Sequence, residues 1–267
     1  MNRKMAVIGV GNMARAILAG IVSADASIDE FFLYDKNENA CDEFRCQKSF
    51  KVVDNVSQAV AKADCVLLSV KPQNYPEVLN EIKRTEGFSE KLYISIAAGI
   101  TSQSVSDTLG GAVVIRVLPN LPMTIGMGVS AICKNDSAKR DDFDFVNSVF
   151  SYAGTTTIID ESEMNRIIGV TSSSPAYVFK FIDSICKGAE AQGLSGKELL
   201  DVVCDVVIGS AMLLKQSSSS PSELISRVAS KGGTTEQALN VLNAKQFDEI
   251  IKDAMVACTV RADELGK

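Results

Sequence analysis

Histidine is absent from the 267 residues of the chain. Serine and cysteine hydrolase triads, the HExxH motif of metalloproteases and histidine general acids are therefore all excluded. Any catalysis must rest on a cofactor, a lysine, a carboxylate or a hydroxyl group. Hydride transfer fits this restriction, because the cofactor carries the reactive group and the protein mainly positions it.

Paired cysteines are missing as well. The seven cysteines, at positions 41, 46, 65, 133, 186, 204 and 258, are scattered, odd in number and never spaced as CxxC. This pattern argues against a disulfide framework and against a zinc site. We expect buried, reduced thiols and no bound metal.

The chain also lacks a long hydrophobic run and an excess of basic residues. No apolar run approaches the roughly 18 residues that span a bilayer, and glycines near the N-terminus interrupt the apolar stretch that a signal peptide would need. The net charge of −6 gives no electrostatic footprint for nucleic acid or an anionic membrane. We expect a cytoplasmic protein that binds neither.

What is present begins with a glycine pattern at the N-terminus. An apolar run from Met5 to Val10 leads into Gly9, Gly11 and Ala14, which form a GxGxxA pattern before an apolar helical stretch. In such a pattern the first glycine allows a tight turn, the second lets the backbone approach a pyrophosphate, and the third small residue keeps the helix close to the strand. The pattern predicts dinucleotide binding, with a purely structural glycine turn as the alternative.

Strands are expected only up to about residue 160, where they alternate with amphipathic stretches. This alternation predicts an α/β fold with a parallel sheet covered on both faces. The expected strands are Met5–Val10, Phe31–Tyr34, Cys65–Val70, Leu92–Ile96, Val113–Leu118, Gly128–Cys133 and Thr155–Ile159.

The remainder of the chain has helical periodicity. One apolar face contains Tyr177, Phe181, Ile185 and Ala189. A second helix is expected to follow 194–197, with Ser195 as its N-cap, and Ser217–Pro221 is expected to be a solvated loop. Helices with several apolar faces bury themselves more fully by pairing with another copy, so we expect a dimer.

Several segments outside the glycine turn contain candidate site residues. Lys71 and Pro72 follow one expected strand, and Ala97 and Ala98 follow the next, at the sheet edge where open α/β folds bind ligands. The segment SKGGTT, at 230–235, offers exposed amides and hydroxyls at a helix start, which suit a small carboxylate. The alternatives are a turn with a solvated lysine and a simple helix connection.

Six motifs together give the chain a specific resemblance. VIGVGNMA, SVKPQ, SIAAGI, RVLPNLP, SSPAYVF and SKGGTT occur in this order over essentially the whole sequence, which is similar to the Δ1-pyrroline-5-carboxylate reductases. The resemblance implies a Rossmann-type domain followed by an all-α dimerisation domain, with decamers in many members. It also implies hydride transfer from NADPH or NADH to the C5=N imine of 1-pyrroline-5-carboxylate, which gives L-proline.

The resemblance also implies roles for individual residues. Cofactor contacts are expected at Gly9, Gly11, Asn12 and Met13 along the pyrophosphate, and at Lys71, Pro72, Ala97, Ala98 and Asn120 near the ribose and nicotinamide. The substrate carboxylate would bind Ser230, Gly232, Gly233 and Thr234, and the Thr235 hydroxyl would point at the imine nitrogen. On this basis residues 1–160 form the dinucleotide-binding domain, and 161–267 form the helical dimerisation and substrate-binding domain.

Cofactor preference depends on the residues after the second expected strand. Asp35 is placed to accept hydrogen bonds from the adenosine ribose and to repel a 2′-phosphate, whereas Lys36 and Asn37 could instead hold that phosphate. Both NADH and NADPH therefore stay open as donors.

Three residues depart from the commoner family pattern: Ser172, Leu121 and Lys231 stand where glycine, threonine and proline are usual. Ser172 adds bulk where helices could approach closely, and Lys231 adds positive charge beside the expected carboxylate site.

Two other functions are alternatives. A hydroxyacid dehydrogenase or imine reductase of related fold is disfavoured, because those dehydrogenases need a lysine that 171–174 lack. A nonenzymatic nicotinamide-binding regulator is disfavoured by the intact SKGGTT.

Overall fold

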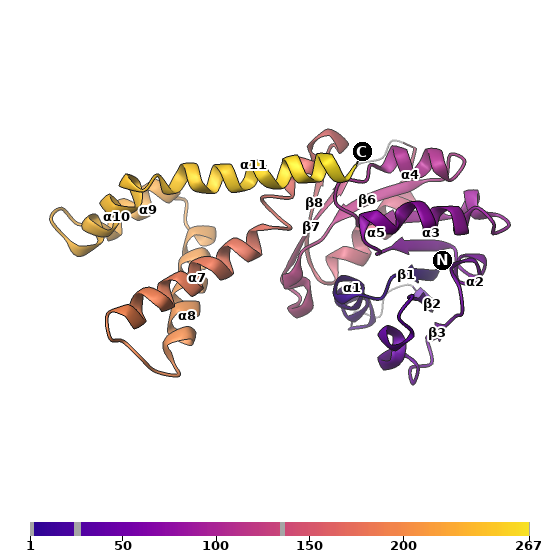
Figure 1. Cartoon of the computed structure of the whole chain (residues 1–267), viewed down its shortest axis with the longest axis horizontal. Coiled ribbons are helices and arrows are strands. Elements are labelled where there is room, and N and C mark those ends of the chain that lie inside the picture. The colour runs from indigo at the N-terminus through magenta and orange to yellow at the C-terminus, as the bar shows by residue number, and fades with distance from the viewer. Residues whose placement is uncertain (1–2, 24–27, 134–136, 267) are drawn as a thin grey trace. The chain divides into compact units, whose positions relative to one another are not determined.

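The structure is a computed structural model that describes residues 3–23, 28–133 and 137–266 (Figure 1). The chain divides into two compact units. The sheet unit consists of residues 1–173 together with 255–267, and the helical unit consists of residues 174–254. In the described part of the chain every strand belongs to the sheet unit, and the last one ends at Ile159. The predicted change from strands to helices is therefore confirmed.

An eight-stranded sheet forms the centre of the sheet unit, in the order β3-β2-β1-β4-β5-β6-β7-β8. Its strands are β1 (Arg3–Ile8), β2 (Ile28–Tyr34), β3 (Phe50–Val52), β4 (Cys65–Leu68), β5 (Leu92–Ser95), β6 (Val114–Leu118), β7 (Gly128–Cys133) and β8 (Gly154–Ile159). The three-residue β3 is absent from the sequence prediction, because so short a strand has no clear alternation.

One strand pair contradicts the predicted parallel sheet. β6 and β7 pair antiparallel, whereas the other neighbouring strands pair in parallel. Their connection contains only the short 3-10 helix η4 (Leu121–Ile125). A parallel pair needs a crossover of a dozen or more residues, so this short connection reverses the chain direction.

Alternate side chains of β1 pack into two different apolar cores. Met5 and Val7 pack into a cluster with α1 (Asn12–Ser23) and α5 (Arg140–Ser151), while Ala6 and Ile8 pack into a second cluster on the opposite face. All four side chains are fully buried. A strand buried on both faces shows a continuous apolar run, as expected for the centre of a parallel sheet.

Short helices complete the covering of the sheet unit. The second face is covered by α2 (Val56–Lys62), α3 (Tyr75–Ile82) and α4 (Ser102–Thr108). The other short elements are α6 (Met164–Ile167) and the 3-10 helices η1 (Glu38–Phe44), η2 (Pro72–Asn74), η3 (Phe88–Glu90) and η5 (Glu161–Glu163).

The C-terminal end of the chain is part of the sheet unit. The last helix, α11 (Phe247–Leu265), places Ala262 in an apolar cluster with Met164 and Ile168. A Cβ atom at Gly99 would lie 2.3 Å from the Ala262 carbonyl oxygen, and Gly99 has a φ of +81°. Glycine at this position therefore lets the end of α11 pack directly on the loop after β5.

The helical unit contains α7 (Ser174–Ala191), α8 (Leu199–Gln216), α9 (Pro221–Val228), α10 (Thr234–Ala244) and the first part of α11. The predicted cap at Ser195 is wrong, since Glu198 is the N-cap of α8. The expected loop before Pro221 is present, and it ends in a capping box in which Ser220 and Glu223 exchange hydrogen bonds. No helix in the described part of the chain combines the length and apolar character that a bilayer crossing requires.

The cysteines only partly follow the expectation of buried thiols. All seven lie in the described part of the chain and are thiols rather than disulfides, but only Cys41, Cys65 and Cys133 are buried, and Cys46 is exposed. Burial raises the pKa of Cys65 to about 12. For Cys133, burial together with the neighbouring Glu161 carboxylate has the same effect on the pKa. These two thiols stay protonated at neutral pH and are poor nucleophiles.

Candidate functional site

The glycine turn lies where β1 ends. Gly9 has a φ of +91°, and a Cβ atom there would lie 2.8 Å from the Ser69 carbonyl oxygen. Its own amide donates to the Tyr34 carbonyl (2.8 Å). Both the backbone conformation and the close approach of the chain after β4 therefore require glycine here. This turn also ends β1 at Ile8, two residues before the predicted end.

Gly11 has no such structural constraint. Its φ is not positive, and a Cβ atom at this position would have no neighbour within 4 Å. The residue immediately precedes α1 and lines a cavity. The protein itself leaves open space at Gly11, which is what close approach of a ligand to the backbone would need.

Asp35 braces the glycine turn from the neighbouring strand. It follows the last residue of β2, and its Oδ2 accepts a hydrogen bond from the Val10 amide (2.7 Å). Its Oδ1 accepts one from the Asn37 amide (2.8 Å). Both carboxylate oxygens thus hold backbone groups, a role that the sequence prediction did not include.

The first cavity lies beside this turn and has a volume of about 380 Å³. Of the residues predicted to bind the cofactor, it brings together Gly9, Gly11, Asp35, Lys36 and Lys71. It is located at the carboxyl ends of β1 and β4, where the strand order reverses. In open α/β sheets, ligands bind at this switch point.

The second cavity, of about 250 Å³, is lined by five residues predicted to bind the cofactor. They are Met13, Lys71, Pro72, Ala97 and Ala98. The other lining residues are Ser69, Val70, Ile96, Leu118, Pro119, Ile168 and Ser172. Ser69, Val70 and Lys71 also line the first cavity, so the two cavities adjoin at the end of β4.

Two predicted cofactor residues lie outside both cavities. Asn12 is the exposed first residue of α1. Asn120 is buried, and both polar atoms of its side chain are engaged: Oδ1 accepts from the Val129 amide (2.8 Å) and Nδ2 donates to the Thr171 carbonyl (3.0 Å). Asn120 therefore holds together the chain segments that follow β6, precede β7 and precede α7.

The three departures from the family pattern have clear surroundings. The Ser172 hydroxyl donates to the Pro119 carbonyl (3.2 Å), so its added atoms make a hydrogen bond beside the second cavity. Leu121 begins η4 and is 46% exposed. Lys231 is exposed.

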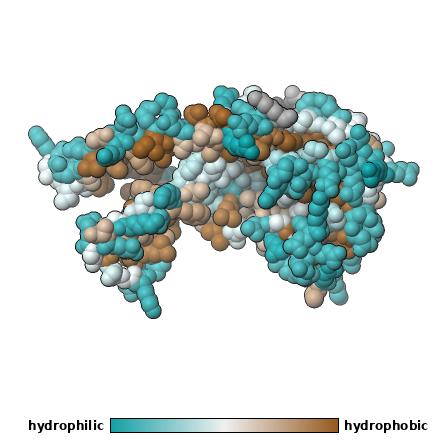
Figure 2. All heavy atoms as spheres, viewed as in Figure 1, coloured by the Kyte–Doolittle hydropathy of each residue, from teal (hydrophilic) through white to brown (hydrophobic). Residues whose placement is uncertain are grey.

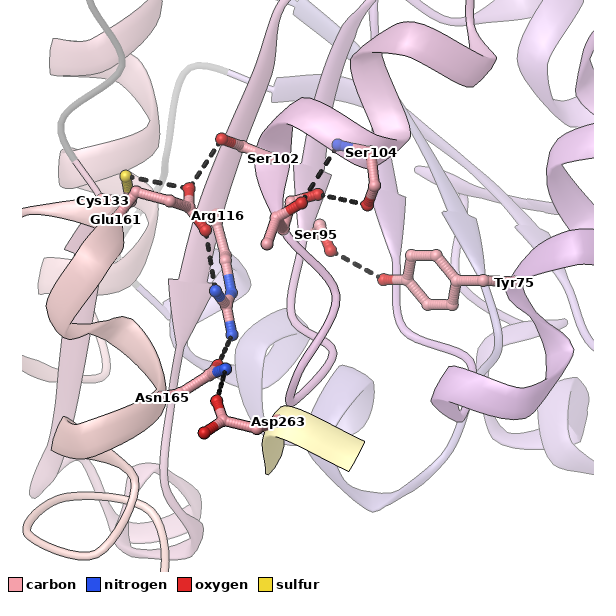
Figure 3. A network of polar contacts seen from close by, with 10 residues as sticks. Tyr75, Ser95, Ser102, Ser104, Arg116, Cys133, Glu161, Asn165 and Asp263 are labelled. Carbon is pink, nitrogen blue, oxygen red and sulfur yellow. Dashed lines mark hydrogen bonds and ion pairs between the residues drawn. The ribbon is translucent and has the colours of Figure 1, made fainter. Parts of the chain in front are cut away.

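A buried charge network, which sequence reasoning missed, supports the strand that leads to Asn120 (Figure 3). The Arg116 side chain on β6 is 1% exposed and donates to Glu161 Oε1 and to Asn165 Oδ1, each at 2.7 Å. Asn165 in turn donates to Asp263 on α11 (2.7 Å). The network connects the sheet to the end of α11. The available signal was a charged residue inside an otherwise apolar strand.

The carboxylate of this network is held in its charged form. Ser102 donates to Glu161 Oε2 at 2.6 Å. Burial alone would raise the pKa of Glu161, but the hydrogen bonds from Ser102 and Arg116 outweigh it and lower the pKa below its ordinary value of 4.5. The Glu161 carboxylate therefore neutralises the buried guanidinium at neutral pH.

The SKGGTT segment of the helical unit forms a tight turn over residues 230–233, and Thr234 and Thr235 are the first two residues of α10. Gly232 has a φ of +73°, and a Cβ atom at Gly233 would lie 2.6 Å from the Ser230 hydroxyl oxygen. Gly233 is the N-cap of α10 and gives it no side-chain cap. The Gly232 amide, predicted to bind a carboxylate, donates to the Glu236 carboxylate at 2.8 Å. The turn thus already holds one carboxylate oxygen.

Comparisons with known proteins agree over the whole chain. The family model described as pyrroline-5-carboxylate reductase dimerisation matches residues 161–265, and the one described as coenzyme F420-dependent NADP oxidoreductase matches residues 4–99. The pyrroline-5-carboxylate reductase of Methanosarcina acetivorans is 31% identical over 100% of this chain and 99% of its own length. That of Haemophilus influenzae is 32% identical, over 99% and 98%.

A solved structure is similar over the same extent. The pyrroline carboxylate reductase of Plasmodium falciparum, crystallised with NADP bound, has a TM-score of 0.89 and 26% sequence identity, and the match covers 100% of this chain and 99% of that one. Identities of 31 and 32% over nearly the full length of both chains decide the assignment. The chain belongs to the pyrroline-5-carboxylate reductase family.

Proposed function

We propose that this protein reduces 1-pyrroline-5-carboxylate to L-proline with NADPH or NADH as the hydride donor, the last step of proline biosynthesis. The observation that carries the proposal is the pair of adjoining cavities at the carboxyl ends of β1 and β4, where five predicted cofactor residues line each cavity. Open space at Gly11 supports a ligand, because nothing in the protein itself requires glycine there.

A bound dinucleotide would extend along the two adjoining cavities. Gly9, Gly11, Asn12 and Met13 would lie along the pyrophosphate, since the amides at the start of α1 favour an anion. Asp35 and Lys36 would face the adenosine ribose, and Lys71, Pro72, Ala97, Ala98 and Asn120 would hold the nicotinamide half. When bound, the reduced nicotinamide supplies the hydride. Asn120 would act by shaping the loops at this edge, because its own amide is engaged.

The substrate would bind through the SKGGTT turn. Its carboxylate would accept hydrogen bonds from the amides and hydroxyls of Ser230, Gly232, Gly233 and Thr234, in place of the Glu236 carboxylate that the Gly232 amide now contacts. The Thr235 hydroxyl would point at the imine nitrogen and form a hydrogen bond with it. A cyclic imine takes its proton from solvent, so orientation and one hydrogen bond suffice without histidine.

Residues 161–267 would act as the dimerisation and substrate-binding domain, and residues 1–160 as the dinucleotide-binding domain. The apolar helix faces described above would pair with those of a second copy, and dimers would assemble further into decamers. Such a homo-oligomer would work in the cytoplasm.

A spectrophotometric assay of the full chain tests the proposal. NADH and NADPH oxidation would be followed at 340 nm with and without pyrroline-5-carboxylate, and proline would be measured as the product. We expect substrate-dependent oxidation of at least one dinucleotide with stoichiometric proline. Binding of a dinucleotide without turnover would favour a nonenzymatic regulator. Reduction of the oxidised dinucleotide by a hydroxyacid, in a parallel assay without pyrroline-5-carboxylate turnover, would favour a dehydrogenase.

A further inference from the structure

An ion pair joins two residues that line the first cavity. Lys36 Nζ donates to Glu77 Oε2 at 2.6 Å, and both residues line the cavity. Lys36 lies just after β2, and Glu77 lies in the first turn of α3. The hydrogen bond to Glu77 raises the pKa of Lys36. The ammonium group is thus already paired with a carboxylate before any phosphate arrives.

Glu77 differs from the two other acids of the cavity in having no structural task. The Asp35 carboxylate holds the amides of Val10 and Asn37. Glu81 accepts from the Val56 amide at the start of α2 (3.0 Å). Among the described residues, the hydrogen bonds and ion pairs of the Glu77 side chain go to Lys36 alone.

We propose that Glu77 is a specificity-determining residue, which neutralises Lys36 and so biases the cavity toward NADH and against NADPH. This inference rests on the proposed function, because it takes the first cavity as the adenosine site. The two dinucleotides differ only in the 2′-phosphate on the adenosine ribose, and the residues just after the second strand face that ribose.

The charges explain the direction of the bias. A 2′-phosphate carries between one and two negative charges, and Lys36 is the basic residue just after β2 that could pair with it. To do so Lys36 must leave Glu77, whose carboxylate then stands unpaired beside the phosphate and repels it. NADH meets no such penalty. Glu77 therefore acts against one ligand rather than for the other.

Binding measurements on the full chain test the proposal without turnover. Dissociation constants of NADH and NADPH would be measured by nicotinamide fluorescence at low ionic strength for the wild type, Glu77→Gln and Lys36→Gln. We expect Glu77→Gln to lower the Kd ratio of NADPH to NADH about tenfold, because a charge-assisted hydrogen bond is gained and a repulsion is lost. Lys36→Gln should raise the ratio.

Glu90→Gln is the matched control. It removes the same charge from η3, which precedes the amino end of β5, whereas the cavity lies at the carboxyl ends of the strands. It should leave the Kd ratio unchanged. When Glu77→Gln is added to Lys36→Gln, it should change the Kd ratio less than it does in the wild type, since no ammonium group is released. At about 1 M salt, where the Debye length is about 3 Å, the effect should also weaken.

Three outcomes count against the inference, and they separate it from the proposed function. An unchanged ratio in Glu77→Gln overturns the role of Glu77, and an equal shift in Glu90→Gln shows that net charge alone is responsible. In both cases the wild type still binds dinucleotides and the proposed function stands. A wild type that binds neither dinucleotide overturns both.

Discussion

The two units of the chain differ in where their apolar side chains lie. In the sheet unit, four consecutive residues of β1 are fully buried between two helical layers. In the helical unit, Phe179, Val206 and Leu213 are 55%, 61% and 59% exposed. Within residues 174–254, all of which the structure describes, Val203 is the single buried apolar residue. The sheet unit completes its core alone, and the helical unit does not.

Such exposure is too extensive for a surface meant to face water. Apolar side chains gather over α7–α11, as the brown areas of Figure 2 show. Monomeric proteins rarely leave large contiguous apolar patches without a partner. The comparison teaches that apolar side chains complete a core within one unit, while in the other they leave exposed faces, in a region that matches a family model described as dimerisation.

The same charge placed on an exposed valine of each unit should therefore change the oligomeric state in one case and not in the other, which is the largest effect expected. Val206→Asp puts a carboxylate on an exposed apolar face of α8, and we expect it to abolish the dimer, because burying an unpaired charge costs several kcal/mol. Val22→Asp on α1, where valine is 50% exposed, is the control and should leave assembly unchanged. Sedimentation velocity distinguishes the two variants. A dimer that persists in Val206→Asp, or a fully active wild-type monomer, would contradict this division of roles.

The next effect concerns the buried charge network that fastens the end of α11 to the sheet unit. Glu161→Gln leaves the Arg116 guanidinium buried without a counter-ion, so we expect the free energy of unfolding to fall by about 3 kcal/mol. Glu163→Gln, an exposed residue of the same 3-10 helix, is the control. Urea denaturation at pH 7 measures both. Equal stabilities would show that the network contributes nothing.

The network also predicts a pH dependence with a definite sign. The pKa of Glu161 is lowered below 4.5 in the folded protein, so its contribution is fully present above that value. It is lost as the pH falls through the lowered pKa. The stability difference between the wild type and Glu161→Gln should therefore shrink at acidic pH, and a constant difference between pH 7 and pH 3 would argue against it.

Much of the fold could be predicted from local patterns. The apolar runs located seven of the eight strands, because strands buried on both faces show as continuous hydrophobic segments. The antiparallel β7 could not be predicted, since chain direction depends on the short connection through η4 and not on the strand itself. The N-cap of α8 was also missed, because Glu198 is a weak capping residue.

The candidate site was predictable where backbone geometry demands a particular residue. Gly9 was predictable, because its positive φ and its contact with the chain after β4 admit no other residue. The engagement of Asn120 and the Lys36–Glu77 pair were not, because both join segments distant in sequence. The role of Arg116 depends likewise on partners from η5 and α6.

A substitution in the helical unit should affect the substrate and spare the cofactor. Thr235→Val preserves shape and removes the hydroxyl proposed to contact the imine nitrogen. Loss of that hydrogen bond should cost about 1 to 3 kcal/mol, or roughly five- to two-hundredfold in kcat/KM for pyrroline-5-carboxylate. NADH binding, measured in parallel, should stay nearly unchanged. Wild-type kcat/KM would reduce Thr235 to a residue of the helix start.

The smallest effect should come from the corresponding substitution in the sheet unit. Asp35→Ser removes a charge from the expected ribose site, so we expect the kcat/KM ratio of NADPH to NADH to rise a few-fold, by about 1 kcal/mol or less. Because Asp35 also braces the Val10 amide, affinity for both dinucleotides should fall. Asp35→Asn keeps an acceptor for the brace while losing the charge, and it separates the two effects. If it shifts the ratio without weakening NADH binding, the charge sets the preference and the hydrogen bond sets the affinity. A ratio unchanged in both variants would place Asp35 away from the ribose and leave it as a support of the glycine turn.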